Sequence, residues 1–234
     1  MLNKIHLLGV GITNETAEGV SEYVLDRLDK GGKKLFIITP NPEILMYAKK
    51  HVAYQNKLNK AEVALADGVG VTFGAWLLGN PIKQRITGVD FIEELCKVSK
   101  EKPISMGFLG AGPGVAERAA ECLKKKYPWI KVAFVGEEWK DPEEMIDILF
   151  VAYGFPKQEE WIYENLEQLP VKAAMGVGGA FDYLSGDVMR APRFLRRLGL
   201  EWLFRLIAQP WRWKRQQALL EFIILVLQER FDRK

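Results

Sequence analysis

The sequence predicts a doubly wound α/β fold with a mostly parallel sheet, followed by a helical C-terminal appendage. Short apolar, β-branched runs alternate with amphipathic stretches through residues 1–184. Nearly continuous apolar strands separated by helices are typical of parallel sheets covered on both faces. Beyond residue 185 the strand signal ends, and arginines, tryptophans and apolar residues follow. We therefore expect a Rossmann-like α/β domain over residues 1–184 and a basic, aromatic helical appendage over residues 185–234.

The expected elements follow this alternation along the chain. Seven apolar runs are expected as strands, at residues 5–10, 35–39, 63–66, 105–109, 131–135, 148–152 and 173–177. Six amphipathic stretches are expected as helices, at residues 16–28, 42–50, 71–77, 91–99, 115–126 and 157–166. Only about a dozen residues separate the strand ending at Val135 from the next, which is the lower limit for a crossover helix. Asp141 and Pro142 therefore start a very short helix, or this connection is irregular.

Composition and charge place the chain among ordinary globular proteins. It has 234 residues, of which 48% are hydrophobic and 27% charged, and a chain of this length buries roughly 70–75% of its unfolded surface. The formal net charge of +3 is unevenly distributed. Residues 185–234 hold 11 Lys and Arg against 5 Asp and Glu, which leaves 22 against 25 for residues 1–184. The basic end favours an anionic partner.

Compartment signals indicate a cytoplasmic protein. Cys96 and Cys122 lie in separate helical patterns without CxxC spacing, which is typical of a reducing compartment. The chain enters an apolar run at residues 5–10 without a basic n-region, so we expect no signal peptide. The longest apolar stretch, Phe222–Leu227, is far shorter than the ~20 residues that span a bilayer.

Histidine and cysteine positions indicate neither a metal site nor a histidine-based triad. His6 lies inside an expected strand and His51 at an expected helix end, and no histidine or cysteine pairs at ligand spacing. Any catalysis is therefore expected to use carboxylates, arginines, amides and helix ends.

Asp67 is the first candidate for catalysis. It ends the apolar run at residues 63–66 and precedes Gly68 at a helix start, and open α/β sheets bind ligands outside the carboxyl ends of their strands. The carboxylate is either a helix N-cap or a base. Downstream, Thr87 is placed to cap the next helix, which leaves Arg85 at the strand-end face, where arginine is suited to bidentate phosphate binding.

Polar residues follow two other expected strands. Asn41 precedes Pro42, a favoured arrangement for an N-cap and first helical residue. Thr39 stands at the same strand end, where a polar ligand contact remains an alternative to a purely structural role. Lys157 and Gln158 lie in the first turn of a later expected helix and point towards the same face.

The turn from Gly110 to Gly114 is the candidate for a phosphate contact. It follows a strand and opens a helix, so the backbone at Gly110 and Gly112 allows close approach of a phosphate to the helix N-terminus. The pattern differs from the dinucleotide fingerprint because Pro113 occupies the second spacer and Ala116 replaces the last glycine. A nucleotide contact, a dinucleotide site and a tight structural turn all remain open.

The appendage combines arginines with tryptophans and an apolar stretch at residues 218–227. Trp202, Trp211 and Trp213 carry amphipathic rings, which are favoured at membrane interfaces. The apolar stretch either lies in the headgroup region of a membrane or packs on its own domain or in a homo-oligomer interface. The candidates for contacts with an acceptor diphosphate or with anionic lipid are Arg190, Arg193, Arg205, Arg212 and Arg215.

Assembled in order, these motifs resemble the WecG/TagA/CpsF glycosyltransferase family (glycosyltransferase family 26). They extend over most of residues 5–215, and the resemblance is strongest to the TagA-like branch of wall teichoic acid synthesis. One departure is that the segment after Val135 is shorter than usual, which affects one wall of the site. The matching stretches are Thr39-Pro-Asn-Pro, Ala66-Asp-Gly-Val-Gly70, Arg85-Ile-Thr-Gly-Val-Asp90, Gly154-Phe-Pro-Lys-Gln-Glu159, Gly178-Gly-Ala-Phe-Asp182 and Arg190-Ala-Pro192.

The resemblance implies an inverting, metal-independent transferase that needs no cofactor. It would move N-acetylmannosamine from UDP-ManNAc to the GlcNAc of undecaprenyl-diphosphate-GlcNAc, peripherally on the inner face of the cell membrane. Asp67 would be the base, Thr39, Asn41, Arg85 and Gln158 would line the pocket, and the appendage arginines would close over it. The alternatives are a related transferase with another donor (ManNAcA or glucose), a nucleotide-dependent oxidoreductase using the turn at Gly110, and a nucleic-acid-binding module. The apolar run of the appendage fits lipid better than nucleic acid.

Overall fold

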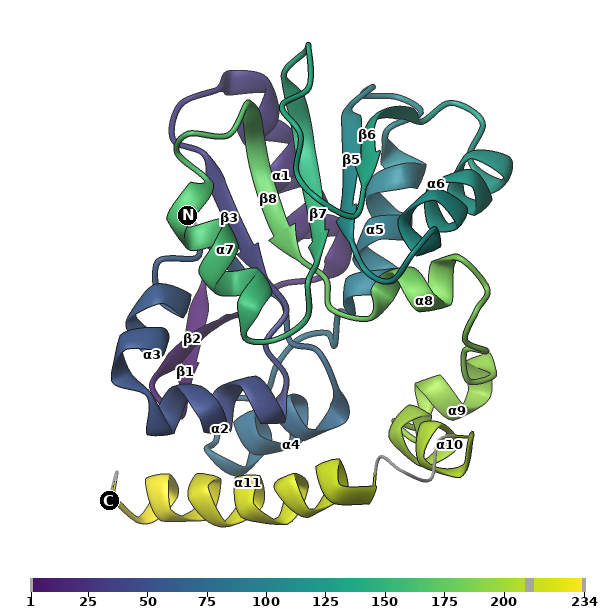
Figure 1. Ribbon diagram of the computed structural model, residues 1–234. Helices are drawn as coiled ribbons and strands as arrows, with labels where there is room; N and C mark the ends of the chain where they lie inside the picture. The colour runs from purple at the N-terminus through teal and green to yellow at the C-terminus, as the bar shows by residue number, and fades with distance from the viewer. Residues whose placement is uncertain (1, 209–212, 233–234) are drawn as a thin grey trace.

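The computed structural model describes residues 2–208 and 213–232, and within them a six-stranded parallel sheet forms the centre (Figure 1). The strand order is β4-β3-β8-β7-β5-β6, and each neighbouring pair is parallel. This confirms the predicted parallel α/β fold. The strands are β3 (Leu35–Ile38), β4 (Val63–Ala64), β5 (Ser105–Gly110), β6 (Lys131–Gly136), β7 (Ile146–Ala152) and β8 (Val171–Gly176).

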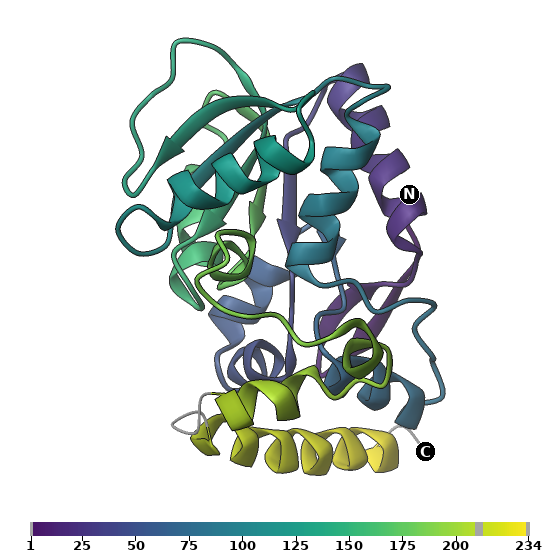
Figure 2. The same cartoon turned by 90° about the vertical axis from the view of Figure 1, so that its right-hand side faces the viewer.

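Helices cover both faces of this sheet. One apolar core forms against α1 (Ala17–Lys30), α5 (Gly88–Val98), α6 (Val115–Lys126) and α8 (Ala180–Leu184) (Figure 2). The other forms against α2 (Pro42–Lys50), α3 (Val52–Leu58), α4 (Val69–Leu77) and α7 (Lys157–Asn165). Along β3, Leu35 and Ile37 enter the first core while Phe36 and Ile38 enter the second. Burial on both faces is why the strands read as unbroken apolar runs.

The N-terminal residues form a hairpin, so the single strand expected at residues 5–10 is wrong. Strands β1 (Lys4–Leu7) and β2 (Val10–Thr13) pair antiparallel and stand apart from the main sheet. Leu8 and Gly9 connect them with φ values of 52° and 81°. Positive φ at both residues of a two-residue turn matches the twist of a hairpin.

Two connections differ from or extend the expectation. Helix α3 was not predicted, because its seven residues lie close behind α2 without a clear break. The stretch at residues 137–145, described throughout, contains no helix, so the irregular alternative applies there. Aromatic rings pack at this place instead: Phe134 and Trp139 have ring centroids 4.9 Å apart, and Trp139 and Trp161 6.2 Å.

The C-terminal part crosses the molecule and ends against it. After α8 the chain passes along the front of the view in Figure 2 through α9 (Arg193–Arg197) and α10 (Glu201–Ala208). Helix α11 (Trp213–Asp232) then lies along α2 and α4 at the bottom of Figure 1. In the described part of the chain, no helix combines the length and apolarity needed to cross a bilayer.

One face of α11 packs on the α/β domain. Phe222 and Val226 are fully buried in the second core. A Cβ at Gly74 of α4 would meet the Phe222 ring at 3.0 Å, so the glycine permits this close approach. Glu229 accepts a hydrogen bond from the Leu8 backbone N–H at 2.8 Å. For this face of α11, the structure confirms the alternative prediction that the apolar stretch at residues 218–227 packs on its own domain.

Replacing Phe222 by alanine should destabilise the protein by about 3–5 kcal/mol, because it leaves a cavity between α11 and the domain. Urea unfolding followed by circular dichroism measures the change. Leu220→Ala is the matched control, since Leu220 lies on the same helix and is 68% exposed. Equal losses in the two variants would contradict the described packing of α11.

Candidate active site

A cavity of about 580 Å³ lies at the carboxyl ends of β3, β4 and β8. The C-terminal segment closes it from the other side, through Arg190, Gly199, Glu201, Trp202 and Leu206. Besides Arg190 and Trp202, five residues singled out from the sequence line it together, although they come from separate parts of the chain. They are Thr39, Asn41, Asp67, Arg85 and Gln158.

Three helices begin at the wall of this cavity. Asn41, Gly68 and Thr87 line it and are the N-cap residues of α2, α4 and α5. Helix N-termini carry backbone N–H groups without helical acceptors and a partial positive charge, so they favour an anion. The cavity is therefore suited to a negatively charged ligand.

Asp67 is held at the end of β4 and is half-buried. Its backbone N–H donates to the Pro40 carbonyl at 3.1 Å, and the preceding Ala66 carbonyl accepts from the Ile86 N–H at 3.0 Å. Gly68, with φ of 94°, takes the N-cap position of α4. Asp67 thus lines the cavity one residue before the N-cap position of α4, so it is not itself the N-cap residue.

Thr39 and Asn41 serve the backbone as well as the cavity wall. The Thr39 hydroxyl is buried and donates to the Gly176 carbonyl at 3.0 Å, which joins the ends of β3 and β8. The Asn41 Oδ1 accepts from the Ile44 N–H at 3.0 Å, so the predicted N-cap is confirmed. Both side chains are fixed in place before any ligand arrives.

Gln158 is buried and bonded on both sides of its amide. Its Oε1 accepts from the Gly178 N–H at 2.8 Å, and its Nε2 donates to Glu159 Oε1 at 2.6 Å. Glu159 is completely buried and accepts a second hydrogen bond from the Tyr54 hydroxyl at 3.0 Å. Burial raises the pKa of Glu159 to about 6. The sequence analysis assigned no role to Glu159 or Tyr54, because the pattern of α7 does not show that Glu159 faces the core.

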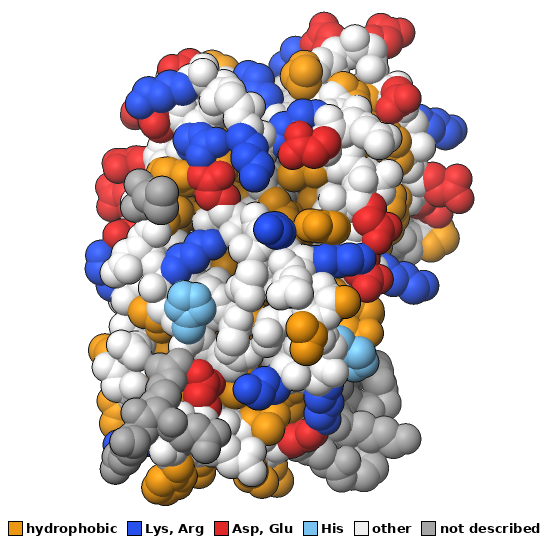
Figure 3. All heavy atoms as spheres, turned by 90° about the vertical axis from the view of Figure 1, so that its left-hand side faces the viewer, with side chains coloured by type: hydrophobic (Ala, Val, Ile, Leu, Met, Phe, Trp, Pro, Cys, Tyr) orange, Lys and Arg blue, Asp and Glu red, His pale blue; other side chains and the backbone are white. Residues whose placement is uncertain are grey.

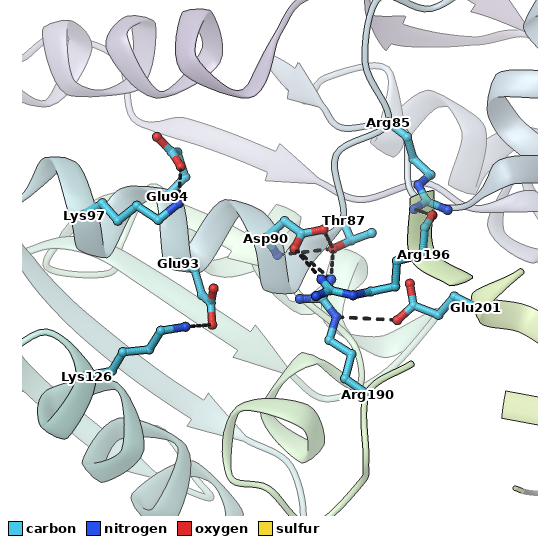
Figure 4. A network of polar contacts seen from close by, with 10 residues as sticks. All are labelled: Arg85, Thr87, Asp90, Glu93, Glu94, Lys97, Lys126, Arg190, Arg196 and Glu201. Atoms are coloured by element: carbon cyan, nitrogen blue, oxygen red, sulfur yellow. Dashed lines mark hydrogen bonds and ion pairs between the residues drawn. The ribbon is translucent and has the colours of Figure 1, made fainter. Parts of the chain in front are cut away.

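Arg190 links the C-terminal segment to α5 beside the cavity (Figure 4). Its Nη2 lies 2.8 Å from Asp90 Oδ1 and donates to the Thr87 hydroxyl at 3.2 Å. Its Nε lies 3.5 Å from Glu201 Oε1. Thr87 also accepts from the Asp90 N–H at 3.2 Å, which confirms the predicted cap of α5.

Two further arginines join this cluster. Arg196 Nη1 lies 3.5 Å from Asp90 Oδ1, and Arg85 Nη2 donates to the Arg196 carbonyl at 2.7 Å (Figure 4). The guanidinium groups of Arg190 and Arg196 therefore pair with the carboxylates of Asp90 and Glu201, and that of Arg85 joins them through the Arg196 backbone. Among the residues that the structure describes, the buried Nε atoms of Arg190 and Arg196 have no hydrogen-bond partner. The cluster places arginines next to a cavity that the carboxylates of Glu43 and Asp67 also line.

Other candidates from the sequence lie elsewhere or outside the description. Gly110 and Gly112 lie at the end of β5, apart from the residues that line the cavity. A Cβ at Gly110 would meet the Tyr153 ring at 2.8 Å, so this turn packs on Tyr153. Arg193, Arg205 and Arg215 lie in α9, α10 and α11, but their side chains are outside the described part of the structure; Arg212 and Trp211 are outside it entirely.

The carboxylates of Glu43, Asp67 and Glu201 also line this cavity. Within residues 2–208 and 213–232, no group of three or more His, Cys, Asp or Glu residues is placed to hold a metal ion. The positive charge in the cavity wall comes from arginines and helix N-termini instead.

Comparison with known proteins identifies relatives over most of the chain. The family model of the glycosyl transferase WecG/TagA/CpsF family matches residues 5–234. The N-acetylglucosaminyldiphosphoundecaprenol N-acetyl-beta-D-mannosaminyltransferase of Bacillus spizizenii is 35% identical over 92% of this chain and 87% of its own length. The enzymes of the same name from Bacillus subtilis and Staphylococcus aureus are also 35% identical, over 85% and 91% of this chain and 81% and 86% of their own lengths. With a match that spans nearly all of its residues, the chain belongs to the WecG/TagA/CpsF family of glycosyltransferases.

Proposed function

We propose that this protein transfers N-acetylmannosamine from UDP-ManNAc to the GlcNAc of undecaprenyl-diphosphate-GlcNAc, a step of wall teichoic acid linkage-unit synthesis. The observation that carries the proposal is the cavity in which Asp67, Arg85 and Gln158 meet at one edge of the sheet. The names of the relatives support the acceptor and the transferred sugar. A related transferase that uses another donor, such as UDP-ManNAcA or UDP-glucose, is the alternative within the same family.

The reaction we propose is a direct displacement with inversion at the anomeric carbon. Asp67 accepts the proton of the acceptor hydroxyl. At the same time the oxygen of that hydroxyl forms the new bond to the anomeric carbon of the donor sugar. The bond to UDP breaks at the same carbon, and UDP leaves with the electron pair. A positioned base of this kind contributes about 10²–10⁴ in rate. Its support is the placement of Asp67 at a strand end, in the wall of the cavity.

The leaving diphosphate gains negative charge during this step. Arg85 and Arg190 line the cavity, and the N-terminus of α4 opens into it. Preorganised positive groups stabilise charge that develops in a transition state. We therefore propose that the transfer is metal-independent, with arginines and helix ends neutralising the leaving group and the diphosphate of the acceptor.

The outer face of α11 supports docking to a membrane. Leu220, Ile224, Leu227 and Phe231 follow the helical period and are exposed, opposite the buried Phe222. Figure 3 shows hydrophobic side chains along the bottom of the molecule, where Figure 1 places α11. An amphipathic helix in a basic segment binds anionic interfaces without spanning them. We propose that residues 1–184 form the catalytic domain and that residues 185–234 complete its site and dock it on the inner face of the cell membrane.

The transferase activity is tested with a panel of UDP-sugars and a short-chain GlcNAc-diphospholipid. We expect a product heavier by one N-acetylhexosamine with UDP-ManNAc, and none with UDP-glucose. Mass spectrometry of the lipid product measures the result. If a product forms only with a different UDP-sugar, that sugar is the donor in place of UDP-ManNAc. If no UDP-sugar gives a product, the proposed function is wrong.

Replacing Asp67 by asparagine should lower turnover at least ~100-fold while the fold is retained, because the amide cannot accept the hydroxyl proton. Initial rates with UDP-ManNAc and circular dichroism measure the two effects. Asp29→Asn is the control, since Asp29 is exposed at the end of α1. Turnover near that of the unmodified protein would remove Asp67 as the base.

Replacing Leu220, Ile224 and Phe231 together by glutamine should abolish binding to phosphatidylglycerol vesicles, because the apolar stripe of α11 is lost. Vesicle co-sedimentation measures binding, and light scattering measures the molecular mass in solution. Val52→Gln is the control, as Val52 is equally exposed on α3. If binding persists while a dimer is converted to a monomer, the stripe is a homo-oligomer interface.

A further inference from the structure

We propose that Glu159 and Tyr54 are positioning residues for the transfer, which hold the amide of Gln158 in a single orientation at the cavity wall. The inference rests on the proposed function, in which Gln158 contacts the substrates. Neither residue lines the cavity, so both act through Gln158.

A chain of three hydrogen bonds connects α3 with the turn after β8. The Tyr54 hydroxyl donates to Glu159 Oε2 at 3.0 Å. Gln158 Nε2 donates to Glu159 Oε1 at 2.6 Å, and the Gly178 N–H donates to Gln158 Oε1 at 2.8 Å. Tyr54, Gln158 and Glu159 are all buried, so water does not compete for these bonds. The chain thereby links a helix remote from the cavity to the glycine turn in its wall.

The polarity of the two flanking groups fixes the amide of Gln158. A backbone N–H only donates, and an ionised carboxylate only accepts. The amide oxygen must therefore face Gly178, and the amide nitrogen must face Glu159. In the reverse orientation the amide N–H would face the Gly178 N–H, and the amide oxygen would face the carboxylate. A Cβ at Gly176 would meet Gln158 Nε2 at 3.0 Å, so the β8 backbone also confines the amide. One N–H and one lone pair of Gln158 remain, in a defined place, for a ligand.

The cost of burying Glu159 indicates that its charge has a role. Glu159 is completely buried, and in the described part of the chain no lysine or arginine forms an ion pair with it. Lys57 of the neighbouring α3 pairs with the exposed Glu164 instead. A buried carboxylate without a cation opposes folding at neutral pH, and a neutral glutamine of the same shape would avoid that cost. Control of the Gln158 orientation accounts for the carboxylate.

Protonation of Glu159 would remove one of the two groups that fix the amide and leave only the bond from the Gly178 N–H. Burial, and to a lesser extent the negative charge of Glu160 on the same helix, raise the pKa of Glu159 to about 6, while the hydrogen bonds from Gln158 and from Tyr54 of α3 oppose the increase. Because the folded-state pKa is raised, the ionised fraction falls as the pH falls through about 6. A protonated carboxyl group donates from one oxygen, so it no longer requires the amide nitrogen of Gln158 to face it.

The first test is the variant Glu159→Gln, which removes the charge and keeps the shape. We expect kcat/KM for UDP-ManNAc to fall about tenfold, the magnitude for loss of one charge-assisted hydrogen bond. In a Gln158→Ala background the same change should have little further effect, because Glu159 acts through Gln158. Fully additive losses would overturn the proposal.

The second readout is the pH dependence of kcat/KM. The unmodified protein should lose activity below about pH 6, and Glu159→Gln should lack this decline. Tyr54→Phe should keep the decline and move it to higher pH, because the hydroxyl that favours the ionised carboxylate is gone. The exposed Glu164→Gln is the control and should retain the profile of the unmodified protein.

These outcomes separate the inference from the proposed function. If the unmodified protein transfers no sugar, the proposed transferase function is wrong. Thermal unfolding of the variants is then the remaining measurement of the role of Glu159. If it is active and Glu159→Gln retains both kcat/KM and the acid decline, the positioning role is wrong. Should Glu159→Gln fail to fold, Tyr54→Phe carries the test, and an unshifted acid decline in that variant would equally overturn the proposal.

Discussion

The parallel pairing of β3 with β4 on one side and β8 on the other is the constraint on which the site depends. Strands that run in one direction end at one edge, so the residues that follow them meet in space although they are far apart in the chain. Asp67 follows β4, Thr39 follows β3, and the glycine turn held by Gln158 follows β8. The bond from the Thr39 hydroxyl to the Gly176 carbonyl joins two of these ends directly. An antiparallel neighbour at any of these places would send its polar residues to the opposite edge.

The C-terminal segment both covers the cavity and carries the arginines that form ion pairs beside it. Asp90 stands in the first turn of α5, where a carboxylate is stabilised by the helix dipole, and it holds Arg190 and Arg196. The same ion pairs that fasten the segment over the cavity therefore bring cationic groups to its rim. The opposite face, over α3 and α7, shows interspersed positive and negative side chains, typical of a solvated surface (Figure 3). The ion pairs thus bring arginines to the rim of a cavity that the carboxylates of Glu43, Asp67 and Glu201 also line.

Features set by neighbouring residues could be predicted from the sequence, whereas features set by distant contacts could not. The Asn41–Pro42 helix start and the Thr87 cap follow local rules, and both are present. The hairpin at Leu8 and Gly9 was missed because its turn lacks the usual Asn-Gly signal, and the apolar run continues through it. The pairing of Arg190 with Asp90 joins residues one hundred positions apart, and the burial of Glu159 depends on how α7 meets α3. No periodicity in the sequence encodes either contact.

The helix-free stretch at residues 137–145 has a consequence for the shape of the cavity. It leaves β6, which forms one margin of the sheet, while Asp67 follows β4 at the other margin. Through Trp139 and Trp161 it packs towards Tyr153, two residues from Phe155 in the cavity wall. Insertions or deletions in this stretch therefore reshape one wall without disturbing the carboxylate or the arginines across the sheet. The packing of this wall is thus separate from the edge of the sheet that carries Asp67.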